Sequence, residues 1–108
     1  MHPVPPYKEK KDYMDVKIHQ VHFRADRKLL DHVRDKSARL SHTDESVDAV
    51  DVYLKLENNH HPVKEKVVEI RMGVPGNTLF VMHKGETFED AFHRALDSAV
   101  EVLRRRKG

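Results

Sequence analysis

Hydrophobic and polar residues alternate with a period of two in the middle of the chain, as they do in strands that bury one face and expose the other. The pattern runs through residues 50–57 and again through residues 67–74, and Asn-Asn-His-His-Pro at residues 58–62 is expected to form the loop between them. Residues 15–21 have the composition of a further strand, and residues 78–81 that of a short strand after a Pro-Gly-Asn turn. These segments predict a sheet with one buried and one solvent-facing side.

Two other segments carry apolar residues at helical spacing. The first spans residues 26–40, with Asp26 as its expected N-cap, and the second spans residues 87–106, with Thr87 as its N-cap and Asp90 three residues on. Their apolar stripes predict that both helices cover the same side of the sheet. The stripes consist of Leu29, Leu30, Val33, Ser37 and Leu40 in the first helix, and of Phe88, Ala91, Phe92, Ala95, Ala99, Val102 and Leu103 in the second.

The order of these elements is β-α-β-β-β-α, which predicts an α+β fold: a two-layer sandwich in which two helices cover one face of a four-stranded sheet. The first strand reaches the second through a helix, so these two strands are expected to be parallel, with a right-handed crossover. The same order is typical of small RNA-facing domains and is similar to that of double-stranded-RNA-binding domains.

The chain of 108 residues is short enough to form a single domain, which we expect over residues 14–108. Residues 1–13 contain three prolines and a cluster of charges, so they are expected to form a disordered leader, and Met14 directly precedes the first strand. The chain has no cysteine, which excludes disulfides and thiol chemistry and fits a reducing cytoplasm. No apolar run approaches the ~20 residues of a membrane span, so no membrane partner is expected.

Charged residues make up 35% of the chain, and the net charge of +2 conceals a separation of the two signs. Residues 44–57 hold five acids and one lysine, whereas residues 24–39 hold six basic residues and three acids, and residues 104–107 are all basic. A charge distribution of this kind orients a protein toward a polyanion better than a uniform charge does. The alternative is that the charges only keep the surface solvated.

The basic residues of the two helices form a candidate phosphate-binding surface. At about 100° per residue, Lys28, His32, Lys36 and Arg39 fall on one flank of the first helix. Phosphate contacts position a nucleic acid without reading its sequence. Structured RNA is favoured over DNA, because no helix-turn-helix is visible and RNA helices are recognised largely by shape. The alternative is a pair of solvated helix faces whose long side chains cover apolar neighbours.

Nine histidines support a competing interpretation, in which the chain is a histidine-rich metal- or ligand-binding domain, or an enzyme that uses these residues. His60 and His61 are adjacent, and the others are scattered. A zinc hydrolase needs three or four converging ligands, usually beside an acid, and no metalloprotease spacing occurs here. The chain also lacks a nucleophile elbow and a phosphate loop. We therefore expect no catalytic residue, no metal site and no cofactor.

Several segments, taken in order, resemble the ribosome hibernation-promoting factor family, which includes sigma-54 modulation proteins and ribosome-associated inhibitors. The likeness covers about residues 14–107, and no single motif carries it. It rests on Ile18 and on residues 29–40, 52–57, 68–79, 87–92 and 95–97.

The resemblance implies a bacterial, cytoplasmic protein that binds the small ribosomal subunit at the decoding region of its 16S rRNA. There it would occlude the channel of messenger and transfer RNA and silence translation in resting, stationary-phase cells under stress, without chemistry. The chain ends at Gly108, without the extension of long relatives, so the likeness is to the short type. A short-type factor would need a separate protein to dimerise ribosomes.

Individual positions carry the resemblance unevenly. The family's basic pair late in the first helix corresponds to Lys36 and Arg39, and its basic residue before the second helix corresponds to Lys84. Ser98 and Glu101 stand where relatives usually have lysine or arginine, and the loop at residues 41–46 lacks a common aromatic residue. The predicted RNA-binding residues are Lys28, His32, Lys36, Arg39, Lys84, Arg94, Arg104, Arg105 and Lys107.

Overall fold

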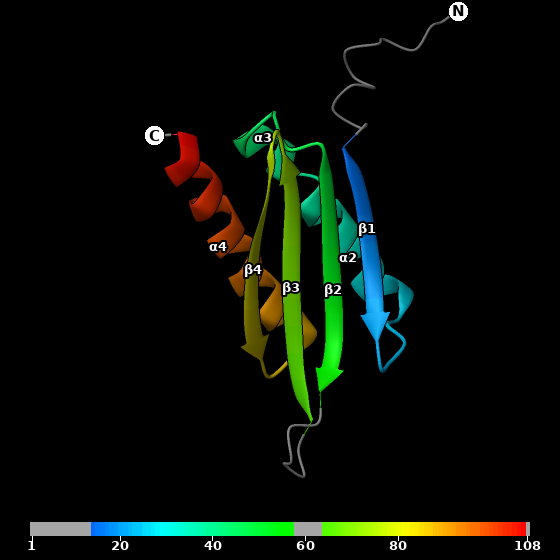
Figure 1. Ribbon diagram of the computed structural model, residues 1–108. Coiled ribbons are helices and arrows are strands. Elements are labelled where there is room, and N and C mark those ends of the chain that lie inside the picture. The colour runs from blue at the N-terminus through cyan, green and yellow to red at the C-terminus, as the bar shows by residue number, and fades with distance from the viewer. Residues whose placement is uncertain (1–13, 58–63, 108) are drawn as a thin grey trace, which may run out of the picture.

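A four-stranded sheet and a layer of helices make up the protein, and the computed structural model describes residues 14–57 and 64–107. The leader predicted over residues 1–13 and the loop predicted over residues 58–62 lie outside the described residues. The strands are β1 (Asp15–Val21), β2 (Ala49–Glu57), β3 (Glu65–Val74) and β4 (Asn77–Gly85). The helices are α2 (Arg27–Ser37), α3 (Leu40–Thr43) and α4 (Phe88–Lys107) (Figure 1).

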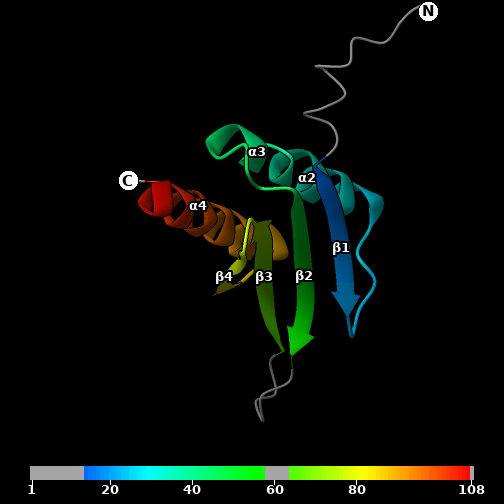
Figure 2. The same cartoon turned by 45° about the horizontal axis from the view of Figure 1, so that its top comes forward.

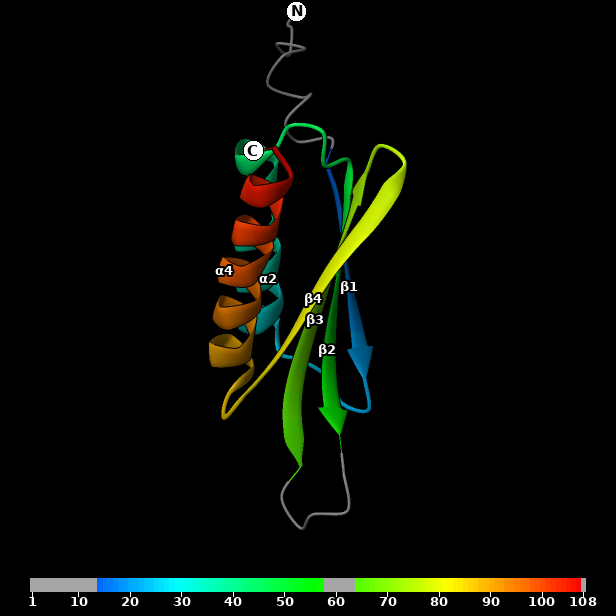
Figure 3. The same cartoon turned by 60° about the vertical axis from the view of Figure 1, so that its left-hand side comes forward.

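The sheet has the strand order β1-β2-β3-β4. β1 is parallel to β2, with Ile18 opposite Val52, and the other two pairs are antiparallel. α2 contacts β1, and α4 contacts β3 and β4, so both long helices cover the same face (Figures 2 and 3). The predicted two-layer α+β sandwich and the parallel first pair of strands are confirmed.

Both predicted N-caps are present. The Asp26 carboxylate accepts a hydrogen bond from the backbone N–H of Leu29 at 2.8 Å, and the Thr87 hydroxyl accepts one from the N–H of Asp90 at 3.0 Å. These bonds satisfy backbone donors that a helix start otherwise leaves without a partner. The capping residues therefore fix where each long helix begins.

The first helix ends earlier than residue 40, where it was predicted to end. α2 stops at Ser37, and the Arg39 N–H then donates to the Lys36 carbonyl at 3.2 Å, a bond to the third preceding residue that tightens the turn. A separate short helix, α3, follows from Leu40. Because Leu40 still lies in the core, its apolar position was assigned correctly although the helix was not continuous.

Small residues let α4 lie close to the sheet. Ala91, Ala95 and Ala99 of α4 are fully buried between this helix and the sheet. At the end of β4, a Cβ added to Gly85 would lie 2.7 Å from the backbone nitrogen of Ala91, which is too close for any larger residue. Six of the seven residues predicted for the apolar stripe of the second helix lie in the core, and Val102 does not; inward side chains of β2 and β3, which include Val52 and Ile70, complete this core.

The fourth strand is longer than the predicted residues 78–81. It runs to Gly85 because it pairs with β3 over its whole length, from Asn77 opposite Val74 to Gly85 opposite Lys66. Phe80 and Met82 point to the side opposite the helices, so both faces of this strand carry apolar residues and the period-two pattern is lost. The Pro-Gly-Asn turn before β4 is confirmed, with Gly76 at φ 74°.

The prediction that the outer side of the sheet is fully solvent-facing was wrong at β3. Val67 is buried and Glu69 is only 7% exposed, although both point away from the helices. Lys55 Nζ donates to Glu69 at 3.0 Å and Arg71 Nε donates to it at 2.9 Å. Long side chains of neighbouring strands thus cover the middle of this face.

Candidate nucleic-acid interface

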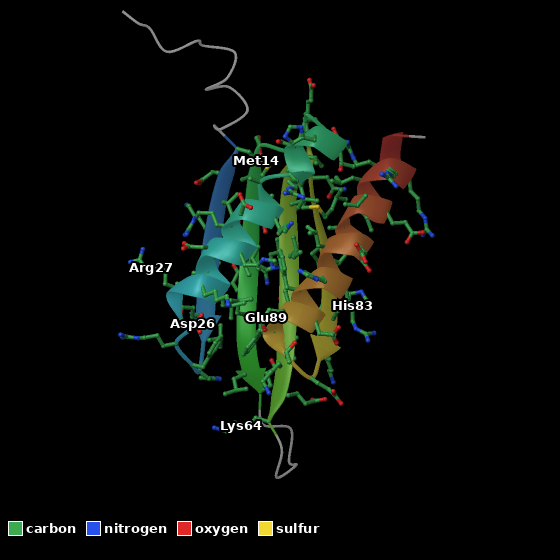
Figure 4. All side chains as sticks on the ribbon, turned by 180° about the vertical axis from the view of Figure 1, so that it is seen from behind. Met14, Asp26, Arg27, Lys64, His83 and Glu89 are labelled. Atoms are coloured by element: carbon green, nitrogen blue, oxygen red, sulfur yellow. The ribbon has the colours of Figure 1, made fainter. Side chains whose placement is uncertain are left out.

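The predicted basic flank of α2 faces α4. His32 Nε2 and His93 Nε2 lie 2.7 Å apart, so one ring donates a hydrogen bond to the other across the two helices. At about 100° per residue, Lys28 and Lys36 lie on the same flank, one turn before and one turn after His32. Arg27 lies on the other flank and points away from α4 (Figure 4).

α4 carries two basic flanks that are separated by acids. Counting about 100° per residue from His93, Arg104 lies on the flank that faces α2. Arg94 and Arg105 lie on the opposite flank, toward β4. Between them, on the crest farthest from the sheet, are three acids, Asp90, Asp97 and Glu101.

The predicted RNA-binding residues therefore do not form one continuous surface. We call the first group the inter-helix surface; it consists of Lys28, His32 and Lys36 from α2 with His93 and Arg104 from α4. Sequence reasoning missed His93 as a member. Helical periodicity places His93 one turn before Asp97 and on the same flank as Arg104, which could have suggested it from the sequence. Only the packing of the helices shows that it meets His32.

The second group lies at the outer edge, where β4 meets α4. Lys84 and Arg94 line a hollow of about 700 Å³ there, together with Lys64, which precedes β3, and Lys66, which lies near its start. The same hollow is lined by Glu65, Glu86 and Asp90. Four cations thus meet three acids, which leaves this edge nearly neutral. Lys64 and Lys66 were not predicted, because their neighbourhood depends on strand pairing.

Each of the three predicted cations on this side of the molecule has an acidic partner. Arg94 pairs with Asp90 at 3.3 Å, Arg105 with Glu101 at 2.8 Å and Lys84 with Glu65 at 3.3 Å. By contrast, Lys28, Lys36 and Arg104 form no ion pair with any residue in the ranges 14–57 and 64–106. A cation without an acidic partner can meet a phosphate without first losing that partner.

Two further predicted residues lie apart from both groups. Arg39 lines a hollow of about 400 Å³ with Met14, Val16 and Arg34, beside β1, because α2 ends before it. It was expected on the flank of Lys36 and lies elsewhere. The side chain of Lys107 lies outside the described residues.

Arg106, which was not among the predicted contacts, has a structural role. Its Nη1 donates to the Asp44 carboxylate at 2.7 Å, and this carboxylate also accepts from the Ser46 hydroxyl at 2.7 Å and the Ser46 N–H at 3.0 Å. The hydrogen bonds from Ser46, reinforced by Arg106, outweigh the effect of burial and hold the pKa of Asp44 below its usual value. The last turns of α4 are thereby fastened to the loop before β2.

The two positions that depart from the family pattern both have partners. Ser98 Oγ lies 2.7 Å from His83 Nε2, and Glu101 accepts from Arg105 Nη2 at 2.8 Å. Glu101 therefore acts twice against phosphate binding: it adds a negative charge to the crest, and it neutralises a neighbouring arginine.

The histidines of the described segments are spread over the molecule. His19 pairs with Asp51 at 2.8 Å, His83 with Ser98, and His93 with His32. Within residues 14–57 and 64–107, no three histidine, aspartate or glutamate side chains are grouped so that they could hold a metal ion. His60 and His61 lie outside these segments. In the same segments, no helix is long and apolar enough to cross a membrane.

Solved structures with the same fold include two proteins of bacteria. A ribosomal subunit interface protein from Coxiella burnetii superposes with a TM-score of 0.75 at 13% identity, over 87% of this chain and 98% of the other. The N-terminal domain of Protein Y from Thermus thermophilus gives a TM-score of 0.70 at 22% identity, over 85% of this chain and 98% of the other. At these identities the likeness establishes the fold.

Comparison with curated protein sequences gives no significant match. A family model does match, and it covers residues 16–108, which include all the strands and helices described above except Asp15, the first residue of β1. The family prediction made from the sequence is thus confirmed: the chain belongs to the sigma 54 modulation protein / S30EA ribosomal protein family, a family of ribosome-associated proteins.

Proposed function

We propose that this protein binds the small ribosomal subunit through 16S rRNA at the decoding region, and inhibits translation by occupying the channel of messenger and transfer RNA. Family membership supports ribosome association. The observation that carries the proposal for this chain is the inter-helix surface, where Lys28, Lys36 and Arg104 lie on the facing flanks of α2 and α4 and form no ion pair among residues 14–57 and 64–106.

These three cations suit the phosphate backbone of structured RNA. Each phosphate that a lysine or arginine neutralises releases condensed counterions, so that affinity falls steeply as salt rises. The contacts would hold the protein in one orientation without reading bases. Inhibition then follows from occupied space, with no reaction step and no cofactor. A separate factor would pair the ribosomes of resting cells.

Charge reversal on the two flanks of α2 tests the surface. We expect the Lys28→Glu/Lys36→Glu variant to raise the Kd for small subunits by roughly an order of magnitude or more, and to lower the salt slope by about two. Arg27→Glu/Arg34→Glu makes the same charge change on the same helix, but on the flank away from α4, and serves as the matched control. Co-sedimentation with purified small subunits at two salt concentrations measures the Kd and the salt slope of each variant.

The same variants test the mechanism in a translation assay. Wild-type protein should inhibit in proportion to the ribosomes present, and less when messenger and initiator transfer RNA are bound first. Equal loss of binding in the two α2 variants would refute the assignment of the surface. Inhibition at substoichiometric protein, or inhibition that a chelator abolishes, would refute occlusion and favour an enzyme that uses the histidines.

A further inference from the structure

Two large apolar side chains are exposed on the side of the sheet that the helices leave uncovered. Phe80 is 63% exposed and Met82 is 54% exposed, and no other large apolar residue within residues 14–57 and 64–106 is exposed. Both belong to β4 and point to the open face, since Leu79 and Val81 pack against the core between and beside them. Figure 3 shows this face of the sheet without any covering element.

The neighbours of Phe80 are planar and cationic. The strand register places Arg71 directly opposite Phe80. The Arg71 guanidinium lies 4.6 Å from the centre of the Tyr53 ring, and this ring stacks on His19 with 4.3 Å between centres and an interplanar angle of 13°. A row of flat groups therefore crosses the sheet and ends at the exposed phenyl ring.

Beneath these groups, the buried carboxylate of Glu69 is held by ion pairs. Glu69 lies opposite Met82 and is held between Lys55 and Arg71. Burial alone would raise the pKa of Glu69, but hydrogen bonds from Arg71 and Lys55 outweigh it and hold the pKa below its usual value. The carboxylate is thus enclosed and does not face an approaching ligand.

Cations adjoin the apolar pair on this face. Asp51, the other acid in the central rows of this face, is occupied by His19 at 2.8 Å. Arg71 and Lys84 are exposed near the apolar pair. Arg71 pairs with Glu69 at 2.9 Å and Lys84 with Glu65 at 3.3 Å, so a phosphate at either cation would share it with the acid or displace the acid. Along β4, an aromatic ring, a thioether and an ammonium group follow at every second residue, on one face.

We propose that this open face is a second RNA-binding site, which takes single-stranded RNA by stacking a base on Phe80. The adjoining base would lie over Met82, with phosphates beside Arg71 and Lys84. Exposed aromatics on a four-stranded sheet bind unpaired bases in this way, because a base must leave its own stack to reach them. The site lies on the side of the sheet opposite the inter-helix surface, and it is independent of the proposed function.

A tryptophan at position 80 provides a direct test, because the chain contains no other tryptophan. We expect a short unstructured RNA to quench the fluorescence of Phe80→Trp saturably. In competition with the wild-type protein, Phe80→Tyr should bind the same RNA nearly as well. Phe80→Leu, which keeps the apolar character but has no π-face, should bind roughly five- to hundredfold more weakly.

Adding Lys28→Glu/Lys36→Glu to Phe80→Trp is the control, and it should leave the quenching titration unchanged. This separates the site from the inter-helix surface, so that failure of either proposal is visible by itself. Absence of quenching, or equal affinity of Phe80→Leu and wild type, would overturn the proposal. A concentration-dependent dimer of wild-type protein that Phe80→Asp dissociates, without RNA binding, would instead assign this face to a second copy of the chain.

Discussion

Replacing Asp44 with alanine removes the point where the end of α4 is fastened to the loop before β2. The carboxylate is buried, with 5% of its side chain exposed, while the Arg106 side chain is 34% exposed. The substitution removes three hydrogen bonds at once, two from Ser46 and one from Arg106. It also leaves the Ser46 N–H and the Arg106 guanidinium without this partner.

The magnitude follows from these contacts. A hydrogen bond to a charged group contributes about 1.5–3 kcal/mol and a neutral one about 0.5–1.5 kcal/mol, and the exposed Arg106 contact lies toward the lower end because solvent screens it. We therefore expect Asp44→Ala to lower the free energy of unfolding by about 2–3 kcal/mol. For a domain of this size the melting temperature should fall by about 10–20 °C.

The pH dependence of the loss has a definite sign. The folded state holds the pKa of Asp44 below the ordinary aspartate value of 3.8, so the carboxylate stabilises the fold above that pH. The contribution disappears as the pH falls through the lowered folded pKa and the group becomes protonated. The difference in free energy of unfolding between wild type and Asp44→Ala should therefore be largest at neutral pH and shrink in strong acid.

Urea unfolding followed by circular dichroism at a series of pH values measures these quantities. Glu45→Ala is the matched control, since Glu45 is an exposed acid next in sequence and should change stability by less than about 0.5 kcal/mol. A loss for Asp44→Ala as small as that of the control would refute the reasoning. If the difference in free energy of unfolding between wild type and Asp44→Ala stays constant down to strong acid, the charge of Asp44 is not its source.

Two further substitutions test the α4 environment. Glu101→Ala should tighten RNA binding and steepen its salt dependence, because it frees Arg105 and removes a negative charge from the crest of α4. Asp15→Ala, which removes an acid on β1, is the control. Equal effects of the two substitutions on the Kd for RNA would refute a specific role of the acids on this crest. Gly85→Ala should lower stability in urea by about 1–3 kcal/mol, since its Cβ would meet backbone, whereas Gly73→Ala, whose Cβ would meet the mobile end of Asp48, should cost less. Equal losses at the two glycines would contradict this account.

The elements that the sequence predicted well are those with a regular apolar period and a recognisable cap. Asp26 and Thr87 mark helix starts because a short side chain before an apolar stripe satisfies the first backbone donors. The errors occur where the apolar pattern does not follow the actual ends or faces of the helices and strands. Leu40 keeps its place in the apolar stripe although the helix has ended. Phe80 and Met82 are apolar on the exposed side of β4, so the alternating pattern did not show how far this strand extends.

The candidate site was predictable to a similar degree. The flank of Lys28, His32 and Lys36 follows from helical geometry alone. The pairs Asp90–Arg94 and Glu101–Arg105 are also readable from the sequence, since residues four apart on a helix are neighbours. The contact of His32 with His93 and that of Asp44 with Arg106 join residues 61 and 62 positions apart, and only the packing of α2, α3 and α4 brings them together.

The number of basic residues is a poor guide to where such a chain meets RNA, because what matters is which cations lack an acid nearby. The three arginines at residues 104–106 illustrate this. Arg106 is bound to Asp44 and Arg105 to Glu101, so that of these three only Arg104 belongs to the inter-helix surface with Lys28 and Lys36. A net charge of +2 is compatible with polyanion binding when several cations without ion-pair partners lie on facing helix flanks. Since few phosphate contacts remain, each one carries a large share of the affinity, and reversal of two of them should be decisive.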